Sequence, residues 1–154
     1  MHLTEFLDFD AIKPALPAGN KRSLLSQLAS LAAGRLDLPA AAILQTLAER
    51  EKLGSTGFGQ GVAIPHGKVE GLKRIYGLFV RLAEPVGYKA IDRKPVDLVF
   101  LLLSPPDAGA EHLKALAAVS RVVRNAATLE KMRGARSRDA LAAVLMGADE
   151  RDAA

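Results

Sequence analysis

Two stretches in the first third of the chain place apolar residues at helical spacing. The first repeats leucine or alanine at intervals of one to four positions, as Leu24, Leu25, Leu28, Leu31 and Ala32. Asn20 offers a side-chain cap at its start, and Gly34 is expected to stop it. The second stretch begins near Asp37 and ends at Leu53, where a glycine follows. We therefore predict two consecutive helices before residue 54.

Four other segments have the character of strands. Residues 96–103 are nearly continuously apolar and rich in Val and Leu, which is typical of a strand covered on both faces. Residues 75–82 alternate weakly and predict a second strand, with a turn over 84–88. A third strand is expected to end at Ile64. Residues 11–17 carry two prolines, so they predict a short edge strand.

The last third of the chain is predicted to be helical. One helix covers residues 110–124, and Thr128 and Ser137 are expected to cap two shorter helices. Residues 148–154 are expected to form a flexible tail after a single domain over 1–147. Together these elements predict an α/β fold in which a small mixed parallel/antiparallel central sheet is sandwiched between helices.

The composition is that of an ordinary globular protein. The 154 residues are 49% hydrophobic and 25% charged, and they include no cysteine. The missing cysteines exclude disulfides and thiolate metal sites. The N-terminus lacks the basic and apolar segments of a secretory signal, and residues 96–103 are too few to span a membrane. We therefore expect a soluble cytoplasmic protein with no membrane span.

The net charge of +4 raises the question of nucleic-acid binding. Much of the excess lies in the last third of the chain, where acidic residues interrupt the basic series. Aromatic residues, which would stack on bases, make up only 5% of the chain. The pattern favours a solvated helical surface, and no nucleic-acid partner is expected.

Candidate chemistry is concentrated between Gly54 and Lys68, in a segment with five glycines, two hydroxyls and a histidine. An imidazole is neutral and nucleophilic near pH 7, so His66 is a candidate phosphoryl acceptor or base. Gly67 beside it would let a ligand or a partner approach closely. The alternative is a structural histidine in a turn, but the surrounding glycines favour a functional one.

Two residues outside this segment are further candidates, and each has a structural alternative. His112 lies near the start of the predicted helix over residues 110–124, where the helix dipole favours the neutral ring. It is either a second catalytic group or a capping histidine. Arg50 lies in the last turn of the second predicted helix, where a cation also stabilises the helix end.

The hydroxyls of Ser55 and Thr56, with the free N–H groups around them, form a candidate cradle for an oxyanion. No Gly-Lys-Ser/Thr follows, so the segment is not an ATP-binding phosphate loop. It leads into a strand and not into the helix that a dinucleotide site requires. The three histidines are far apart in sequence and no cysteine accompanies them, so no metal site is expected.

The segment Glu49–Lys68 resembles the signature of enzyme IIA domains of the phosphoenolpyruvate phosphotransferase system (PTS), in the mannitol/fructose-type superfamily. It is most similar to the nitrogen-regulatory enzyme IIA branch, and His112–Ala117 resembles the second histidine motif of that family. The resemblance covers nearly the whole chain, as a PTS enzyme IIA type-2 domain. It implies a mixed α/β sandwich and a phosphohistidine carrier that needs no cofactor and no metal.

The resemblance also implies roles for individual residues. His66 would be phosphorylated, His112 would hydrogen-bond the phosphoryl group, and Arg50 would neutralise its charge. Thr56 would donate its hydroxyl to the same group. The other residues implied around the phosphoryl group are Ser55 and Gly67.

The implied donor is a small phosphocarrier protein of the HPr type that docks on a shallow apolar rim. Phe58 and Val69 are candidates for that rim, although Phe58 is equally suited to anchor its loop in the core. Partners implied by the branch are potassium-transport regulators, sensor kinases and metabolic enzymes.

The resemblance implies a phosphotransferase-system component, a histidine phosphocarrier that transfers phosphoryl groups. The chain has no room for the fused transport domains of sugar-transporting relatives, which favours a regulatory output over a metabolic one. Two alternatives are left open. One is a sugar-specific enzyme IIA that passes the phosphate to a separate permease component, and the other is a non-catalytic binding module.

Overall fold

A computed structural model describes residues 1–153 of the chain, and side-chain environments through residue 151. Within that range no helix combines the length and the apolarity that a bilayer crossing requires. The strands are β1 (Lys13–Leu16), β2 (Gly57–Gly59), β3 (Val62–Ala63), β4 (His66–Lys68), β5 (Tyr76–Val86) and β6 (Val96–Ser104). The helices are α1 (Lys21–Leu36), α2 (Ala40–Lys52), α3 (Gly109–Val123), α4 (Ala126–Gly134) and α5 (Arg138–Ala153), after two 3₁₀ turns, η1 (Leu3–Glu5) and η2 (Phe9–Ala11).

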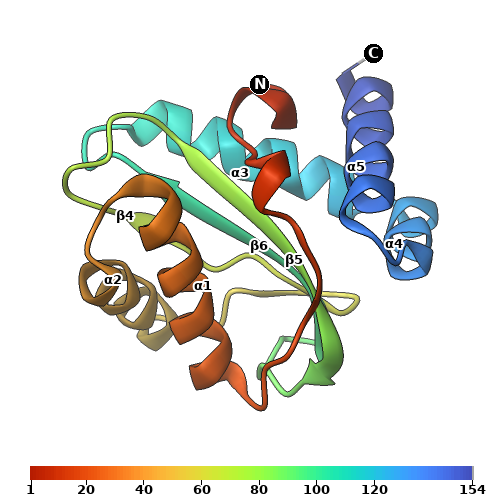
Figure 1. Ribbon diagram of the computed structural model, residues 1–154, viewed down its shortest axis with the longest axis horizontal. Helices are drawn as coiled ribbons and strands as arrows, with labels where there is room; N and C mark the ends of the chain where they lie inside the picture. Colours follow the sequence, from red (N-terminus) through yellow and green to blue (C-terminus); the bar gives the residue numbers. More distant parts are fainter. Residues whose placement is uncertain (154) are drawn as a thin grey trace.

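The strands form one mixed sheet in the order β1-β5-β6-β3-β2. Figure 1 shows its long strands β5 and β6 side by side. The long strands β5 and β6 run antiparallel, and β1 lies parallel to β5 at one edge. Along the other side of β6, first β3 and then β4 run parallel to it, and β2 pairs antiparallel with β3. This arrangement confirms the predicted mixed sheet.

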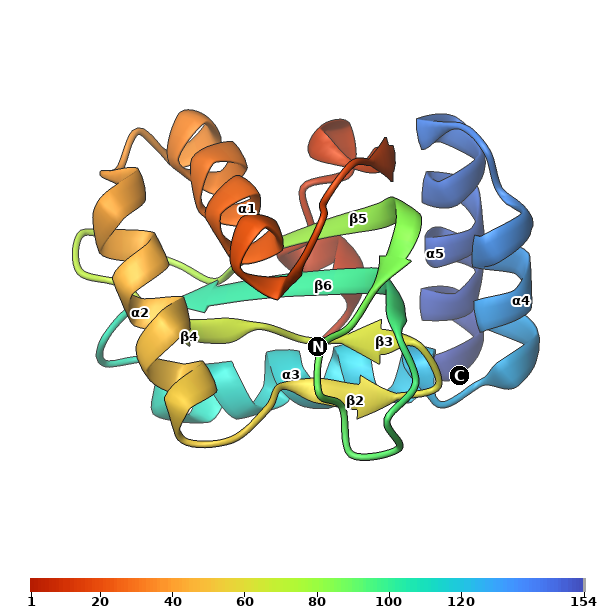
Figure 2. The same cartoon turned by 90° about the horizontal axis from the view of Figure 1, so that it is seen from below.

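Helices cover both faces of the sheet, as Figure 2 shows. Helices α1 and α2 pack on one face, whereas α3, α4, α5 and the N-terminal turns pack on the other. Successive residues of β6 therefore enter different cores. The residues facing α3–α5 are Leu98, Phe100 and Leu102, and those facing α1 and α2 are Val99 and Leu101. All five are at most 1% exposed, which confirms the prediction of a strand covered on both faces.

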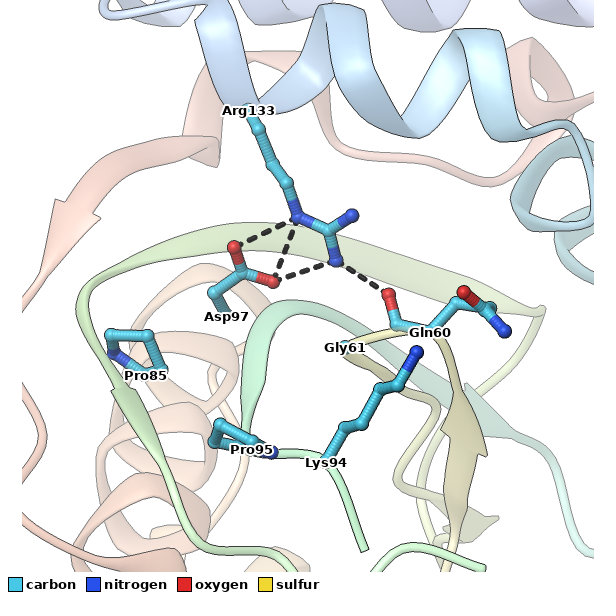
Figure 3. Close-up of a pocket in the computed structure, with 7 residues that line it drawn as sticks. All are labelled: Gln60, Gly61, Pro85, Lys94, Pro95, Asp97 and Arg133. Carbon is cyan, nitrogen blue, oxygen red and sulfur yellow. Dashed lines mark hydrogen bonds and ion pairs between the residues drawn. The ribbon is translucent and has the colours of Figure 1, made fainter. Parts of the chain in front are cut away.

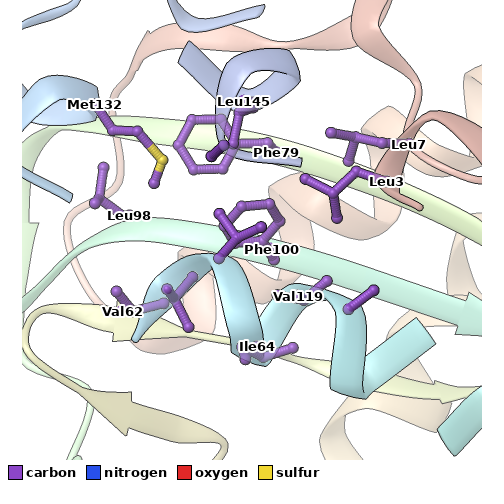
Figure 4. Close-up of a cluster of buried hydrophobic side chains, with 14 of the residues drawn as sticks. Leu3, Leu7, Val62, Ile64, Phe79, Leu98, Phe100, Val119, Met132 and Leu145 are labelled. Carbon is purple, nitrogen blue, oxygen red and sulfur yellow. The ribbon is translucent and has the colours of Figure 1, made fainter. Parts of the chain in front are cut away.

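The core beneath α3, α4 and α5 is centred on two phenylalanines in contact (Figure 4). Phe79 on β5 and Phe100 on β6 have ring centroids 4.8 Å apart. Leu3, Met132 and Leu145 belong to the same cluster and come from the N-terminal turn and two helices. Because full burial of such a side chain stabilises the fold by about 1.5–3 kcal/mol, this cluster fastens both ends of the chain to the sheet.

Side-chain caps begin three helices, and one helix ends later than predicted. Ser137 caps α5 as predicted, because its Oγ accepts the N–H of Ala140 at 3.1 Å. Asn20 caps α1 through a 2.8 Å hydrogen bond to the backbone, as predicted. Gly34 does not end α1, which continues until Asp37 adopts a left-handed conformation with a φ of 55°. The cap of α4 is Asn125 and not Thr128, because Thr128 donates its own N–H to the Asn125 side chain.

Strand β5 is longer than its weak alternation predicts. It continues through Glu84 and Pro85 to Val86, with an irregular register between Arg81 and Val86. Pro85 has no N–H to donate, and an irregular stretch of the ladder tolerates that gap. The strand therefore takes up part of the predicted turn over 84–88, and the chain turns later, at Ile91 and Asp92, where the N–H of Arg93 donates to the carbonyl oxygen of Ala90 at 2.9 Å.

The C-terminal helix departs most from the prediction. Helix α5 continues to Ala153 instead of ending at the predicted domain boundary, and residue 154 lies outside the described residues. Ala148 is 1% exposed and Asp149 is 7% exposed, so the predicted tail over 148–154 begins inside the core. The physical reason is a 2.8 Å hydrogen bond in which the buried N–H of Leu3 donates to Oδ1 of Asp149.

This contact generates a stability prediction. Replacing Asp149 by alanine leaves a buried backbone N–H without its acceptor, which should lower the free energy of unfolding by about 1–3 kcal/mol. Urea denaturation followed by circular dichroism measures the change. The matched control is Glu150→Ala, since Glu150 is the exposed neighbour in α5 and should change stability by at most about 0.5 kcal/mol. Equal effects of the two variants would contradict the role assigned to Asp149.

Candidate functional site

Strand β4 sets the direction of the side chains at the site, because it pairs in parallel register with the last three residues of β6. Side chains alternate across a strand, so His66 and Lys68 face α3 whereas Gly67 faces α2. Two neighbours agree with this assignment. Leu102 pairs with His66 and belongs to the core beneath α3, and Thr46 of α2 lies against Gly67. The site therefore lies between two helices at the end of β6.

The ring of His66 is held by one hydrogen bond on each nitrogen. Its Nδ1 lies 2.7 Å from the carbonyl oxygen of Ile64. A carbonyl only accepts, so Nδ1 carries the ring proton. Nε2 keeps its lone pair, which accepts a hydrogen bond from Nε of Arg50 at 3.2 Å. The neutral ring thus turns its nucleophilic nitrogen toward the guanidinium.

Arg50 comes from the last turn of α2 and links that helix to the glycine-rich segment. Besides contacting His66, it donates from Nη1 to the carbonyl oxygen of Gly54 at 2.8 Å. These two bonds use Nε and Nη1, and no hydrogen bond from Nη2 is found within residues 1–153. Of the two interpretations that the sequence left open for Arg50, its place beside His66 supports a role in the site.

His112 lies in the first turn of α3 with its ring beside that of His66. The two ring centroids are 5.6 Å apart, at an interplanar angle of 48°. Nδ1 of His112 is 2.5 Å from Oγ of Ser104, a fully buried residue at the end of β6. The fold thus brings Arg50, His66 and His112 together from three different elements, while their roles in transfer stay a prediction.

The surroundings of both rings disfavour an added proton. Burial lowers the pKa of His66 below the ordinary value of 6.5, and the positive charge of Arg50 lowers it further. A backbone carbonyl and a nearby carboxylate act in the opposite direction, yet the net shift in pKa is downward. Burial likewise lowers the pKa of His112, and the charges of His66 and Lys68 add to that effect. The lowered pKa values favour the neutral form of both imidazoles.

The hydroxyls of the glycine-rich segment are already hydrogen-bonded within the fold. The hydroxyl of buried Thr56 bonds Glu51 and Tyr88, and its N–H also donates to Glu51. Ser55 donates its hydroxyl to the carbonyl oxygen of Tyr88 and accepts a backbone N–H of the same segment. The reason is the carboxylate of Glu51, which gathers the nearby donors, Nζ of Lys21 at 2.6 Å among them. Both residues line the hollow that contains His66, and their contact with a phosphoryl group stays a prediction.

Two glycines of the segment make room for other parts of the protein. A Cβ on Gly67 would overlap Cγ2 of Thr46, so helix α2 occupies the space that a side chain would fill, and a contact of Gly67 with a phosphoryl group stays a prediction. A Cβ on Gly61 would overlap the guanidinium of Arg133, and its φ of +79° also disfavours a side chain.

Arg133 lines a hollow near the start of β6, away from the two histidines (Figure 3). Its Nε donates to Asp97 at 2.9 Å, and its Nη2 donates to the carbonyl oxygen of Gln60 at 2.5 Å. These bonds tie α4 to β6, through Asp97, and to the turn between β2 and β3, through Gln60. They therefore fix the hairpin that leads into β4.

Only one of the two residues predicted for the docking rim is exposed beside the site. Phe58 is 36% exposed and lines a hollow of about 280 Å³ together with His66 and Leu116. Val69 is 3% exposed and packs in the core beneath α1 and α2, so its prediction as a rim residue is wrong. A backbone hydrogen bond to the end of β6 extends the strand pairing and draws Val69 inward. Leu113, which is 66% exposed on α3, is an apolar surface residue that the sequence did not single out.

Three other residues of the site were not singled out from the sequence either. Lys68 has a clear signal, since it lies two positions after His66 and so shares its face of a strand. Ser104 is the polar end of a long apolar run, and Glu51 follows directly after Arg50. Their contacts join different elements of the fold, and periodicity alone does not predict such contacts.

Comparison with known proteins identifies the class. The model of the family described as "Phosphoenolpyruvate-dependent sugar phosphotransferase system, EIIA 2" matches residues 5–147. The chain belongs to this family. The match confirms the resemblance noted from the glycine-rich segment and the second histidine motif.

Three individual proteins are similar to this chain over most of its length. A nitrogen regulatory protein of Bradyrhizobium diazoefficiens is 46% identical over 145 residues, which cover 94% of this chain and 95% of the relative. A PTS system fructose-specific EIIA component of Haloferax volcanii is 37% identical over 131 residues, covering 84% of each chain. The crystal structure of nitrogen regulatory protein IIA-Ntr from Neisseria meningitidis matches with a TM-score of 0.87 and 38% identity, over 93% of this chain and 98% of that one.

The contact between Gly67 and Thr46 generates a second prediction. Gly67→Ala should lower the free energy of unfolding by about 1–3 kcal/mol, because its methyl group overpacks the contact between β4 and α2. Urea denaturation measures the loss. The double variant Gly67→Ala/Thr46→Ser removes the overlapping methyl group and should recover most of it.

The matched control for this prediction is Gly34→Ala. Gly34 lies inside α1 with nothing within 4 Å of an added Cβ. Alanine there should be neutral or stabilise the helix by about 0.5–1 kcal/mol. A Gly67→Ala variant as stable as the Gly34→Ala variant would contradict the close approach of α2.

A third prediction concerns the pKa of His66. Arg50→Ala removes a positive charge beside the ring, so the pKa of His66 should rise. A pH titration of the ring protons by NMR measures it, with Lys52→Ala as a control that removes an equal charge from an exposed position of α2. Because the pKa of His66 is lower in the folded protein than in the unfolded chain, protonation of the ring favours unfolding. The free energy of unfolding of the wild type should therefore decline as the pH falls below about 6.5. An unchanged pKa in Arg50→Ala would contradict the contact.

Proposed function

We propose that this chain is a regulatory phosphocarrier. His66 accepts a phosphoryl group from an HPr-like phosphocarrier protein, and the phosphorylation state decides which partner proteins bind. The observation that carries the proposal is the hydrogen bond from Nδ1 of His66 to Ile64, because it leaves Nε2 unprotonated beside Arg50. Relatives that bear the name nitrogen regulatory protein support a regulatory output.

The reaction moves a phosphoryl group from a phosphohistidine of the donor to His66. Nε2 attacks phosphorus in line, and the new phosphorus–nitrogen bond forms as the bond to the donor breaks. The bonding electron pair returns to the donor ring. The ring of His66 gains positive charge, and the hydrogen bond from Nδ1 to the carbonyl of Ile64 stabilises that charge. No proton has to leave His66 during this step.

Positive groups around Nε2 would stabilise the negative charge on the transferred oxygens. Arg50 already contacts Nε2, and its planar guanidinium suits two oxygens of one phosphoryl group. The ring of His112 lies alongside and offers a nitrogen donor. Lys68 adds positive charge on the same face of β4. Such preorganised charges are a large source of catalysis in phosphoryl transfer.

The choice of partner protein follows from a change in charge at an exposed surface. Phe58 and Leu113 are exposed apolar residues beside the histidines, and they form a surface on which partner proteins would dock. The unphosphorylated surface presents Arg50 and Lys68. A phosphoryl group adds a charge of about −1.5 to −2 there, enough to repel one partner and recruit another.

A second candidate is a sugar-specific enzyme IIA that passes the group to a permease component. The fructose-specific relative favours it, since it is 37% identical over most of both chains. Transfer onward distinguishes the two functions. Phosphorylated protein mixed with permease components and a labelled sugar should yield no sugar phosphate under the regulatory proposal, whereas rapid formation of sugar phosphate would replace it.

The fourth prediction tests transfer directly. Incubation with phosphoenolpyruvate, enzyme I and the HPr-like protein should produce an acid-labile, base-stable adduct, and His66→Ala should abolish it. Arg50→Ala should slow transfer by about 100-fold while melting temperature stays near wild type, because the guanidinium acts on transition-state charge. Rapid-quench measurement of the phosphorylated fraction gives the rate. Exposed Arg22→Ala on α1 is the charge control and should transfer at the wild-type rate.

Two outcomes would contradict this account. Absence of any adduct, under conditions that phosphorylate the HPr-like protein, would leave a non-catalytic binding module. Wild-type transfer kinetics in Arg50→Ala would remove that residue from the mechanism.

A further inference from the structure

Ser104 is a buried polar residue in direct contact with the second histidine of the site. It is 0% exposed, at the end of β6, where the strand is otherwise apolar. Its Oγ lies 2.5 Å from Nδ1 of His112. Within the described residues this is the hydrogen bond that its hydroxyl makes, and a buried hydroxyl without a partner is unfavourable. The contact therefore constrains where the proton of the neutral ring sits.

Two arrangements of hydrogen are compatible with the short contact. If Nδ1 of His112 carried the proton, it would donate to Ser104, and the hydroxyl hydrogen of Ser104 would have no acceptor in the interior. If instead the Ser104 hydroxyl donates to Nδ1, both groups are satisfied and the ring proton resides on Nε2. The second arrangement leaves no buried donor unpaired and is the favoured one.

We propose that Ser104 is a positioning residue that holds His112 in the tautomer protonated at Nε2. Nδ1 is taken up by Ser104, so Nε2, on the opposite edge of the partly buried ring, is the nitrogen left to contact a ligand. His112 then presents an N–H donor, and not a lone pair, beside the ring of His66. A lone pair there would repel the oxygens of a phosphoryl group, whereas an N–H attracts them.

The two histidines are therefore held in opposite tautomers by their hydrogen-bond partners. A carbonyl fixes the proton of His66 on Nδ1 and leaves Nε2 as the nucleophile. A hydroxyl fixes the proton of His112 on Nε2 and makes that nitrogen a donor. Ser104 itself is fully buried and faces the ring, so it acts through His112 and not on the phosphoryl group. The consequence for transfer rests on the proposed function, but the tautomer does not.

The fifth prediction is spectroscopic and uses the unphosphorylated protein. Nitrogen-15 NMR of the imidazoles at pH 7.5 or above should show His112 protonated at Nε2 and His66 protonated at Nδ1. Ser104→Ala should convert His112 to a mixture of tautomers without changing His66, and Ser104→Thr, which keeps the hydroxyl, should retain the Nε2 form. A wild-type His112 protonated at Nδ1, or an unchanged tautomer in Ser104→Ala, would overturn the proposal.

Transfer kinetics test whether Ser104 acts through His112. Ser104→Ala should slow phosphoryl transfer by about tenfold, as loss of an orienting partner commonly does, and Ser104→Thr should restore the rate. In a His112→Ala background the same change should have no further effect, because the ring that Ser104 orients is gone. An equal slowing in both backgrounds would show a structural effect and overturn the proposal. If wild-type protein accepts no phosphoryl group at all, the proposed function fails and the NMR result alone decides the role of Ser104.

Discussion

The parallel pairing of β4 with the end of β6 is the constraint on which the rest of the site depends. It points His66 and Lys68 toward α3 and Gly67 toward α2. If the register between β4 and β6 shifted by one residue, the side chains would exchange faces. The imidazole of His66 would then point toward α2, and Gly67, which has no side chain, would face α3. The apolar pattern of β6 resists such a slip, because its residues alternate between two filled cores.

Both helices reach the histidine because of that register. Thr46 rests on Gly67, and Arg50 follows one turn later on the same face of α2, so the packing that requires glycine also delivers the guanidinium to Nε2. On the other side, His112 lies one turn before Leu116, which lines the hollow beside His66. The glycines thus position the helices and the hairpin that surround His66, and the loop lines one side of the hollow beside it.

Residue patterns predicted those parts of the fold that depend on local chemistry. Helical spacing, the cap at Asn20 and the doubly covered strand β6 are all confirmed. These features depend on the types of residues that are close together in the sequence, which a pattern records directly. The pattern failed where a side chain binds a partner that periodicity does not reveal. The hydroxyl of Thr56 bonds Glu51 while the residue lines the hollow beside His66. Asp149 accepts a hydrogen bond from Leu3, which brings what was predicted as a tail into the core.

The candidate site was predictable to a similar extent. His66, His112 and Arg50 were recognised from a motif, and the fold brings them together. The tautomer of each ring was not predictable, because it is set by a single atom from another position: a carbonyl for His66 and Oγ of Ser104 for His112. Hydrogen-bond partners of this kind are visible only once the backbone is placed.

The central claim is that Nε2 of His66 is the atom that receives the phosphoryl group. The most direct measurement is the coupling between phosphorus-31 and the ring nitrogens, observed by NMR in nitrogen-15 labelled protein after phosphorylation by the HPr-like donor. We expect phosphorus to couple to Nε2 of His66, because Nδ1 is committed to the carbonyl of Ile64. Coupling to Nδ1 of His66, or to either nitrogen of His112, would contradict this account.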